Sequence, residues 1–158
     1  NTDLHWMQLA LAQSREAFDR GDWPTGAVLV RDGQLLSTGQ NRQVSQCDTT
    51  VHAETDAIRR AEAIHGVGST QGATLYCTME PCPMCAGAIV HARLRRVIFG
   101  CPDAKGGGAG GLLNILQMPQ LNHRSEITPG VMAEECLHLI QEFFRARRQT
   151  SLPPTCEH

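Results

Sequence analysis

The chain has 158 residues, of which 41% are hydrophobic and 19% charged, and its formal net charge is −2 at pH 7. This balance fits one globular domain, and no apolar run approaches the roughly 20 residues of a membrane span, so no membrane partner is expected. The charge excludes the strongly basic balance typical of nucleic-acid-binding proteins, although it does not exclude a local basic patch. Seven irregularly spaced cysteines do not indicate a disulfide framework, which favours a cytoplasmic setting.

Hydrophobic periodicity and turn residues predict helices and strands that alternate along the chain. A first helix is expected to begin at Thr2 or Asp3 and to continue to about Arg20, with Gly21 as its stop. A β-hairpin follows, because Asp32-Gly33 is a turn signal between two short runs with β character. The strands are expected over 26–30, 34–39, 73–78, 96–100 and 125–128. The later helices are expected over 52–65, 81–93, 112–117 and 128–148.

Strands that are separated by helices indicate a mixed sheet with helices on both faces. The predicted fold is therefore a three-layer α/β/α sandwich around a mixed five-stranded sheet. Residues 1–150 are expected to form a single domain, and 151–158 a loose C-terminal tail. The polar stretch 41–51 and the glycine-rich stretch 106–111 are expected to be loops, and the latter lacks the Lys-Ser/Thr ending of a phosphate-binding loop.

Two short segments carry the residue types of a zinc site. The first is His52-Ala53-Glu54, and the second contains Cys82 and Cys85 at the start of a predicted helix. Zinc favours imidazole nitrogen and thiolate sulfur, and cysteines three residues apart at a helix start place both sulfur atoms on one side. A helix N-terminus also favours the thiolate form. His52, Cys82 and Cys85 would leave a fourth position open for water, which is typical of a catalytic zinc.

Glu54 follows His52 by two residues and is expected to border the same pocket without binding the metal. Zinc lowers the pKa of bound water toward about 7, and a nearby carboxylate can pass a proton from that water to a substrate. HxE followed by PCxxC is the recognised signature of zinc-dependent base deaminases. A redox pair or a structural zinc site is the alternative, and a structural zinc would require a fourth ligand such as Cys77 or Cys101.

Beyond these motifs, the chain resembles the bacterial tRNA-specific adenosine deaminases from about Trp6 to Gln149. The resemblance rests on HAE (52–54), EPCPMCAGAIVHAR (80–93), RRVIFG (95–100), DAKGGGAGGLLNIL (103–116), NHR (122–124), EITPGV (126–131) and EFFRARRQ (142–149). It implies a cytidine deaminase-like fold, a homodimer and one zinc ion per subunit. It also implies hydrolytic conversion of adenosine to inosine at the wobble position of a tRNA anticodon stem-loop.

The resemblance also implies roles for single residues. His52, Cys82 and Cys85 match the zinc ligands, and Glu54 matches the proton shuttle. The positions that match substrate-binding residues are Asn41, Asp103, Lys105, Asn122, His123, Phe144, Arg147 and Arg148. Such residues suit a single-stranded RNA loop, whose bases are stacked on aromatic rings and whose phosphates are bound by arginine.

Each of these substrate-binding residues also has a purely structural interpretation. Asn41 could cap local backbone groups, and Asp103 could be a turn residue. Phe144 could belong to the core, and the arginines could complement the C-terminus of their helix.

The chain departs from the family pattern at a few positions. Thr25 stands where the family usually has an aliphatic residue and is added to the candidate substrate-binding residues, and Thr49, Thr55 and Asp56 also differ. These departures leave open a deaminase of a free base or nucleoside, such as guanine, cytosine or adenosine. A non-catalytic zinc- or RNA-binding module is the least favoured hypothesis, because it has no use for Glu54.

Overall fold

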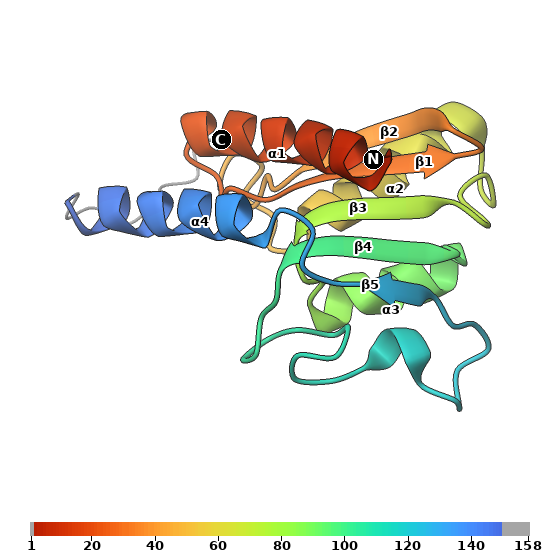
Figure 1. The fold of residues 1–158 in the computed structure, drawn as a ribbon. Coiled ribbons are helices and arrows are strands. Elements are labelled where there is room, and N and C mark those ends of the chain that lie inside the picture. The colour runs from red at the N-terminus through yellow and green to blue at the C-terminus, as the bar shows by residue number, and fades with distance from the viewer. Residues whose placement is uncertain (1, 150–158) are drawn as a thin grey trace.

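Five strands form one mixed sheet in the order β2-β1-β3-β4-β5 in the computed structural model of the chain, which describes residues 2–149 (Figure 1). β1 pairs antiparallel with both β2 and β3, whereas β4 pairs in parallel with β3 and with β5. The strands are β1 (Gly26–Arg31), β2 (Gln34–Gln40), β3 (Thr74–Met79), β4 (Arg96–Cys101) and β5 (Glu126–Thr128).

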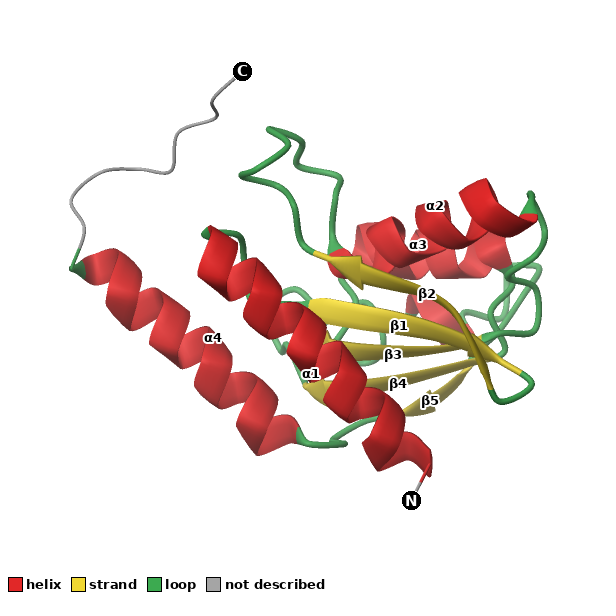
Figure 2. Ribbon diagram, turned by 90° about the horizontal axis from the view of Figure 1, so that it is seen from above, coloured by secondary structure: helices red, strands yellow, loops and turns green. Residues whose placement is uncertain are grey.

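Two helices cover each face of this sheet (Figure 2). α1 (Thr2–Arg20) and α4 (Ala133–Arg148) lie on one face, and α2 (Ala53–His65) and α3 (Pro83–Ala92) lie on the other. Because successive side chains of a strand point to opposite faces, each face buries its own apolar cluster. Leu75 belongs to the cluster on the α2–α3 side, whereas Tyr76 belongs to the cluster on the α1–α4 side. The predicted three-layer α/β/α sandwich is thereby confirmed.

The elements that carry the site meet at one end of the sheet. β3 and β4 are parallel and are joined by α3, so α3 begins directly after β3 ends at Met79. α2 begins at the same place, because its N-cap His52 contacts both Cys82 and Cys85 at the start of α3. Two helix N-termini therefore face each other beside the C-terminal ends of β3 and β4.

The start of the last helix was predicted wrongly. The helix was expected from 128, but α4 begins at Ala133. Gly130 and Met132, which flank Val131, both have positive φ values, 83° and 56°, which an α-helix does not allow. Between them, Val131 N donates a hydrogen bond to Phe99 O over 3.2 Å and so ties this turn to β4. The helix expected over 112–117 is reduced to a short 3₁₀ helix, η1 (Ile115–Gln117).

Two further expectations concern the tail and the cysteines. The expected tail over 151–158 lies outside the described residues. Cys77, Cys82, Cys85, Cys101 and Cys136 carry free thiols. Cys47 is disulfide-bonded, which the irregular spacing of the cysteines did not predict. Across residues 2–149, none of the helices has both the length and the apolar character required to cross a membrane.

Candidate active site

Three metal-binding atoms converge where α2 and α3 begin. His52 is the N-cap of α2, Cys82 is the N-cap of α3, and Cys85 lies in the first turn of α3. His52 Nδ1 lies 3.5 Å from Cys82 Sγ and 3.4 Å from Cys85 Sγ, and all three atoms lie within 4.8 Å of one another. A tetrahedral zinc ion with its usual bond lengths would hold nitrogen and sulfur ligands about 3.5 Å apart. The donor atoms and their spacing therefore fit a zinc ion.

The electrostatics of the two thiols differ although they share one site. A contact with Cys85 lowers the pKa of Cys82 to about 4, helped by His52 and by the backbone N–H of Cys85 and opposed by burial. The same contact, together with burial, raises the pKa of Cys85 well above its usual value. Two sulfur atoms this close cannot both carry a negative charge at little cost, and a bound cation removes that cost by deprotonating both.

Glu54 is buried beside these donors. It lies in the first turn of α2 and is only 5% exposed. Burial raises the pKa of its carboxyl group, although Cys85 and His52 act in the opposite direction. A carboxylate that is held away from water binds a proton more strongly than a solvated one does. The position suits a group that accepts and then returns a proton.

Two of the donors, His52 and Cys82, line a cavity of about 170 Å³ together with Glu54. This volume is smaller than the 300–1,000 Å³ of typical drug-sized sites, so the cavity suits one base rather than a larger ligand. Beside the donors, its walls include Trp23, Thr25, Asn41, Glu80 and Asp103. Thr25, Asn41 and Asp103 were predicted from the sequence to bind substrate, and all three line this cavity.

Asn41 is both a cavity residue and a local cap. It is 3% exposed, its side-chain oxygen accepts a hydrogen bond from Gln43 N, and its amide nitrogen donates to the Gln43 side chain over 2.9 Å. Its own backbone N–H donates to Thr25 O over 3.2 Å. The two predicted substrate residues are thus held side by side, and the structural interpretation of Asn41 describes how it is oriented.

Asp103 likewise combines a turn with the cavity wall. Its carboxylate accepts hydrogen bonds from the backbone N–H groups of Lys105 and Gly106, each over 3.1 Å. Lys105 itself is exposed and does not line the cavity. Lys105 remains a predicted substrate contact outside the base pocket.

The structure does not bring Asn122 and His123 to this cavity. The ring nitrogen Nε2 of His123 lies 2.6 Å from Leu94 O, just after the C-terminal end of α3. Asn122 lines a separate depression with His91 and Arg93 at that same end of the helix. Cys82 lies at the opposite end of α3, so neither residue can contact a base in the cavity of the same chain.

An aromatic cluster adjoins the cavity wall. The Trp23 ring lies 5.1 Å from the Phe144 ring, edge to face, and 5.4 Å from the Phe143 ring. The Arg147 guanidinium lies 5.8 Å from the Trp23 ring centroid. Phe143 is buried, whereas Phe144 is 41% exposed, so Phe144 is not a core residue.

Trp23 was not predicted as a site residue from the sequence, although its position two residues before Thr25 was an available signal. Arg148 is exposed near the end of α4.

Glu80 was also missed. This buried residue accepts hydrogen bonds from backbone N–H groups of Asp103, Ala109 and Gly111. The glycine-rich stretch is therefore a tightly turning loop around one carboxylate, in agreement with the loop predicted over 106–111.

Most departures from the family pattern have structural partners outside the cavity. Thr55 Oγ1 accepts a hydrogen bond from His52 N over 3.0 Å and donates to Thr50 O, which caps α2. Asp56 accepts a hydrogen bond from Gln40 N and pairs with Arg42 over 3.2 Å. Only Thr25 of the singled-out departures lines the cavity.

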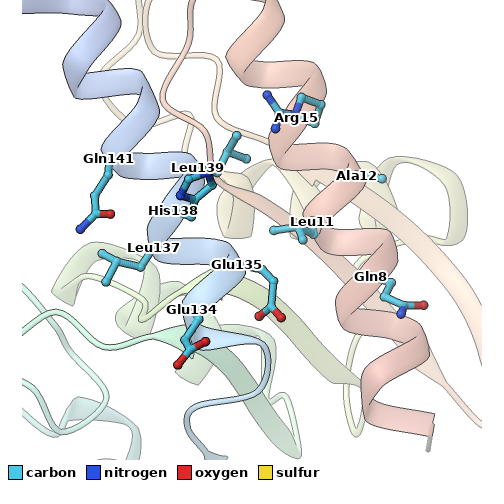
Figure 3. Close-up of a pocket in the computed structure, with 10 residues that line it drawn as sticks. All are labelled: Gln8, Leu11, Ala12, Arg15, Glu134, Glu135, Leu137, His138, Leu139 and Gln141. Atoms are coloured by element: carbon cyan, nitrogen blue, oxygen red, sulfur yellow. The ribbon is translucent and has the colours of Figure 1, made fainter.

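A larger groove of about 860 Å³ lies elsewhere, between α1 and α4 (Figure 3). Its labelled residues include Leu11 and Arg15 on α1 and Glu134 and His138 on α4. None of its lining residues belongs to the metal-binding group or to the walls of the smaller cavity. Size alone therefore does not identify the reactive site.

Comparisons with known proteins show the family to which this chain belongs. Residues 1–148 match the model of the MafB19-like deaminases. The tRNA-specific adenosine deaminase of Bacillus subtilis is 41% identical over 147 residues, which covers 93% of this chain and 91% of the relative. That of Agrobacterium fabrum is 40% identical, covering 91% and 95%. A solved structure from work on A-to-I editing by tRNA deaminases at the wobble position matches with a TM-score of 0.82 and 39% identity, covering 85% of this chain and 98% of that one.

Proposed function

The chain belongs to the tRNA-specific adenosine deaminases within the MafB19-like deaminases, and we propose that it converts adenosine to inosine at the wobble position of a tRNA anticodon. The observation that carries this proposal is the convergence of His52, Cys82 and Cys85 beside the buried Glu54 in a cavity the size of a base. The relatives that share about 40% identity over most of both chains are named tRNA-specific adenosine deaminases, and the solved structure that matches with 39% identity comes from work on A-to-I editing at the wobble position.

The donor set supports one zinc ion per chain, held by His52 Nδ1 and by the sulfur atoms of Cys82 and Cys85. When bound, zinc supplies a Lewis acid that makes water nucleophilic near neutral pH. The contacts of Cys82 with Cys85 and His52 lower its pKa and favour the thiolate, which is the form of cysteine that binds zinc.

Glu54 moves the proton in the proposed reaction. Water adds to the ring carbon that bears the amino group, and Glu54 transfers a proton from that water to a ring nitrogen. Glu54 then takes the remaining proton from the added hydroxyl group and passes it to the amino nitrogen. The bond from the carbon to that nitrogen breaks as the carbonyl forms, and ammonia leaves. Asn41 and Thr25 line the wall at which the edge of the base would lie, and an Asn side chain can both donate and accept hydrogen bonds.

The surroundings of the cavity support RNA rather than a free base as substrate. Phe144 is an exposed aromatic ring next to Trp23, a cavity residue. Arg145, Arg147 and Arg148 lie in the last turn of α4 and give a local basic end to a chain of net charge −2. An aromatic ring with neighbouring arginines can stack bases and bind phosphates on either side of a base that has left the stack.

Three further expectations, on the domain organisation, the oligomeric state and the location of the protein, complete the proposal. We infer that residues 1–150 act as one deaminase domain, that the chain works as a homodimer, and that it acts in the cytoplasm on tRNA. The support for these inferences is the likeness to tRNA-specific adenosine deaminases. The position of Asn122 and His123 away from the cavity leaves their substrate role a prediction.

A substrate panel tests the proposal. Zinc-loaded protein is offered an anticodon stem-loop with adenosine at the wobble position, a matched stem-loop with that adenosine moved by one position, and free guanine, cytosine, adenine and adenosine. We expect inosine in the first stem-loop and little reaction elsewhere. Turnover of a small molecule with an untouched stem-loop would instead support the free-base alternative and make Thr25 the first residue to examine.

A further inference from the structure

We propose that Glu80 is a positioning residue whose buried carboxylate fixes the 103–111 segment against the metal-binding turn and thereby sets one wall of the base cavity. Glu80 stands between the end of β3 at Met79 and the Pro81-Cys82 pair. It is 5% exposed and lines the cavity. The inference rests on the proposed function only in that the anticodon stem-loop is the substrate used to test it.

The hydrogen-bond partners of Glu80 explain how a buried carboxylate is tolerated here. One oxygen accepts from Asp103 N over 3.1 Å, and the other accepts from Ala109 N over 3.2 Å and from Gly111 N over 2.9 Å. A buried carboxylate is costly unless its charge is compensated, and converging backbone N–H groups form a site for an anion. Three N–H groups from one loop therefore use Glu80 as their common acceptor.

The glycines of the loop allow this close approach. A Cβ atom at Gly107 or Gly111 would collide with the Glu80 carboxylate. A Cβ atom at Gly108 would lie 3.0 Å from the backbone of Cys82, and Gly108 N donates a hydrogen bond to Pro81 O over 2.6 Å. The loop thus contacts Glu80 on one side and the turn of a metal ligand on the other, because these positions carry no side chain.

These contacts connect two parts of the site that are far apart in sequence. Cys82 follows Glu80 by two residues. Asp103 donates its backbone N–H to Glu80 and lines the same cavity as Cys82. Two of the three metal donors, His52 and Cys85, do not depend on this link, because they come from the starts of α2 and α3. Loss of the Glu80 charge should therefore release the substrate wall while the metal-binding group stays assembled.

The test compares wild type with Glu80→Gln. The amide retains the size of the side chain but has only one acceptor oxygen. Its NH₂ group would face backbone N–H groups of the loop, and two donors cannot form a hydrogen bond with each other. We expect KM for the stem-loop to rise about tenfold or more, since hydrogen bonds to a charged group are worth roughly 1.5–3 kcal/mol, with a much smaller change in kcat. Zinc content should stay at one per chain. Backbone amides at 103, 109 and 111 should exchange hydrogen at least about tenfold faster.

Asp3→Asn is the matched control for lost stability. Asp3 is a partly buried carboxylate that accepts hydrogen bonds from Tyr76 and Arg96 and lies beside the start of β4, whereas the site lies beyond its end. If Glu80→Gln lowers Tm as Asp3→Asn does and leaves KM and the exchange at 103–111 unchanged, Glu80 is only structural and the proposal is wrong. Loss of zinc with unchanged exchange would assign Glu80 to the ligand turn instead and would also overturn it.

A second pair of variants covers poor folding of Glu80→Gln. Gly107→Ala places a methyl group against the same carboxylate, which is the nearest group to a Cβ atom at that position, and Gly87→Ala on α3 meets no atom within 4 Å. We expect the first to raise KM and loop exchange and the second to change neither. An equal response of both variants would contradict the proposal. Zinc content and exchange do not depend on the substrate, so an inactive wild type would refute the proposed function alone.

Discussion

Glu54 combines the three properties that proton transfer at this site requires. It is buried, it lies beside the metal donors, and it faces the cavity in which a base would bind. It is not among the residues that offer a ligand atom to the metal-binding group. Binding of the metal and movement of the proton are therefore assigned to different side chains.

Glu54→Gln separates these two roles. The substitution keeps the shape of the side chain and removes its ability to carry a proton, so turnover should fall by about 10²–10⁴-fold. Zinc content should remain at one per chain, measured by metal analysis of the same preparation that is assayed for inosine. A variant that loses its zinc would show that Glu54 holds the metal and that the assignment above is wrong.

Phe144 tests whether the aromatic cluster binds RNA. Phe144 contacts Trp23 at the cavity and remains 41% exposed, so part of its ring is accessible to a base bound outside the cavity. Stacking of one base is worth roughly 1–3 kcal/mol, so Phe144→Ala should raise KM for the stem-loop between about fivefold and 150-fold.

Leu137→Ala provides the control for Phe144. Leu137 lies on the same helix, has a similar exposure of 46%, and lines the groove between α1 and α4 instead. KM should stay unchanged in this variant. If both variants bind the stem-loop like wild type, the end of α4 does not contribute to RNA binding.

At the scale of elements, one fully buried carboxylate helps to hold the loop between β2 and α2. Asp22 follows α1, and its carboxylate accepts hydrogen bonds from Val44 N and Ser45 N, each over 2.9 Å, and from Arg20 Nε. Its side chain is fully buried. Since this loop also contains Asn41, Asp22 helps to hold a cavity residue in place.

The pKa of Asp22 gives this loop a predicted acid sensitivity. Burial acts to raise the pKa, but the hydrogen bonds from Ser45 and Arg20 outweigh it, and the pKa is lowered. A carboxylate whose pKa is lower in the folded state stabilises that state above its unfolded-state pKa of about 3.9 and stops doing so as the pH falls through the folded value.

Asp22→Asn should therefore cost about 2–3 kcal/mol of unfolding free energy at pH 7. This cost should shrink as the pH falls from about 5 toward 3, because wild type loses the same contribution there. Urea unfolding of both proteins across this range measures the difference. A difference that stays constant with pH would show that the Asp22 charge does not stabilise the loop.

Local signals in the sequence were enough to predict most elements. Asp32-Gly33 marked the hairpin, and both residues have the positive φ values that such a turn requires. The pairing of His52 with Cys82 and Cys85 was also predictable, because zinc chemistry restricts which residue types can meet. The start of α4 was not predictable from periodicity, since a contact of Val131 with β4 and the left-handed Met132 determine it.

The substrate side of the site was less accessible from sequence than the metal side. The partners of Glu80 are backbone N–H groups 23–31 residues away. Because almost every residue type has the same backbone N–H group, the sequence does not indicate which of them a side chain will contact. Trp23 lines the cavity itself, and its contact with Phe144 depends on how α4 packs in three dimensions. Asn122 and His123 matched family positions, but a sequence match does not say at which end of α3 a residue lies.

At the scale of the whole molecule, a small deaminase cavity, a metal-binding group and an aromatic and basic helix end are arranged around one end of the sheet. This arrangement predicts a reaction that is confined to one nucleotide of a folded RNA, because the base must leave the stack while its neighbours are bound outside the cavity.

The most direct measurement is to incubate the zinc-loaded protein with unfractionated tRNA and to map inosine by sequencing at every adenosine. The account predicts that new inosine is found at the first anticodon position of tRNAs that carry adenosine there, and that Glu54→Gln produces none. Inosine spread over other positions, or no inosine at all from a protein that holds one zinc per chain, would contradict it.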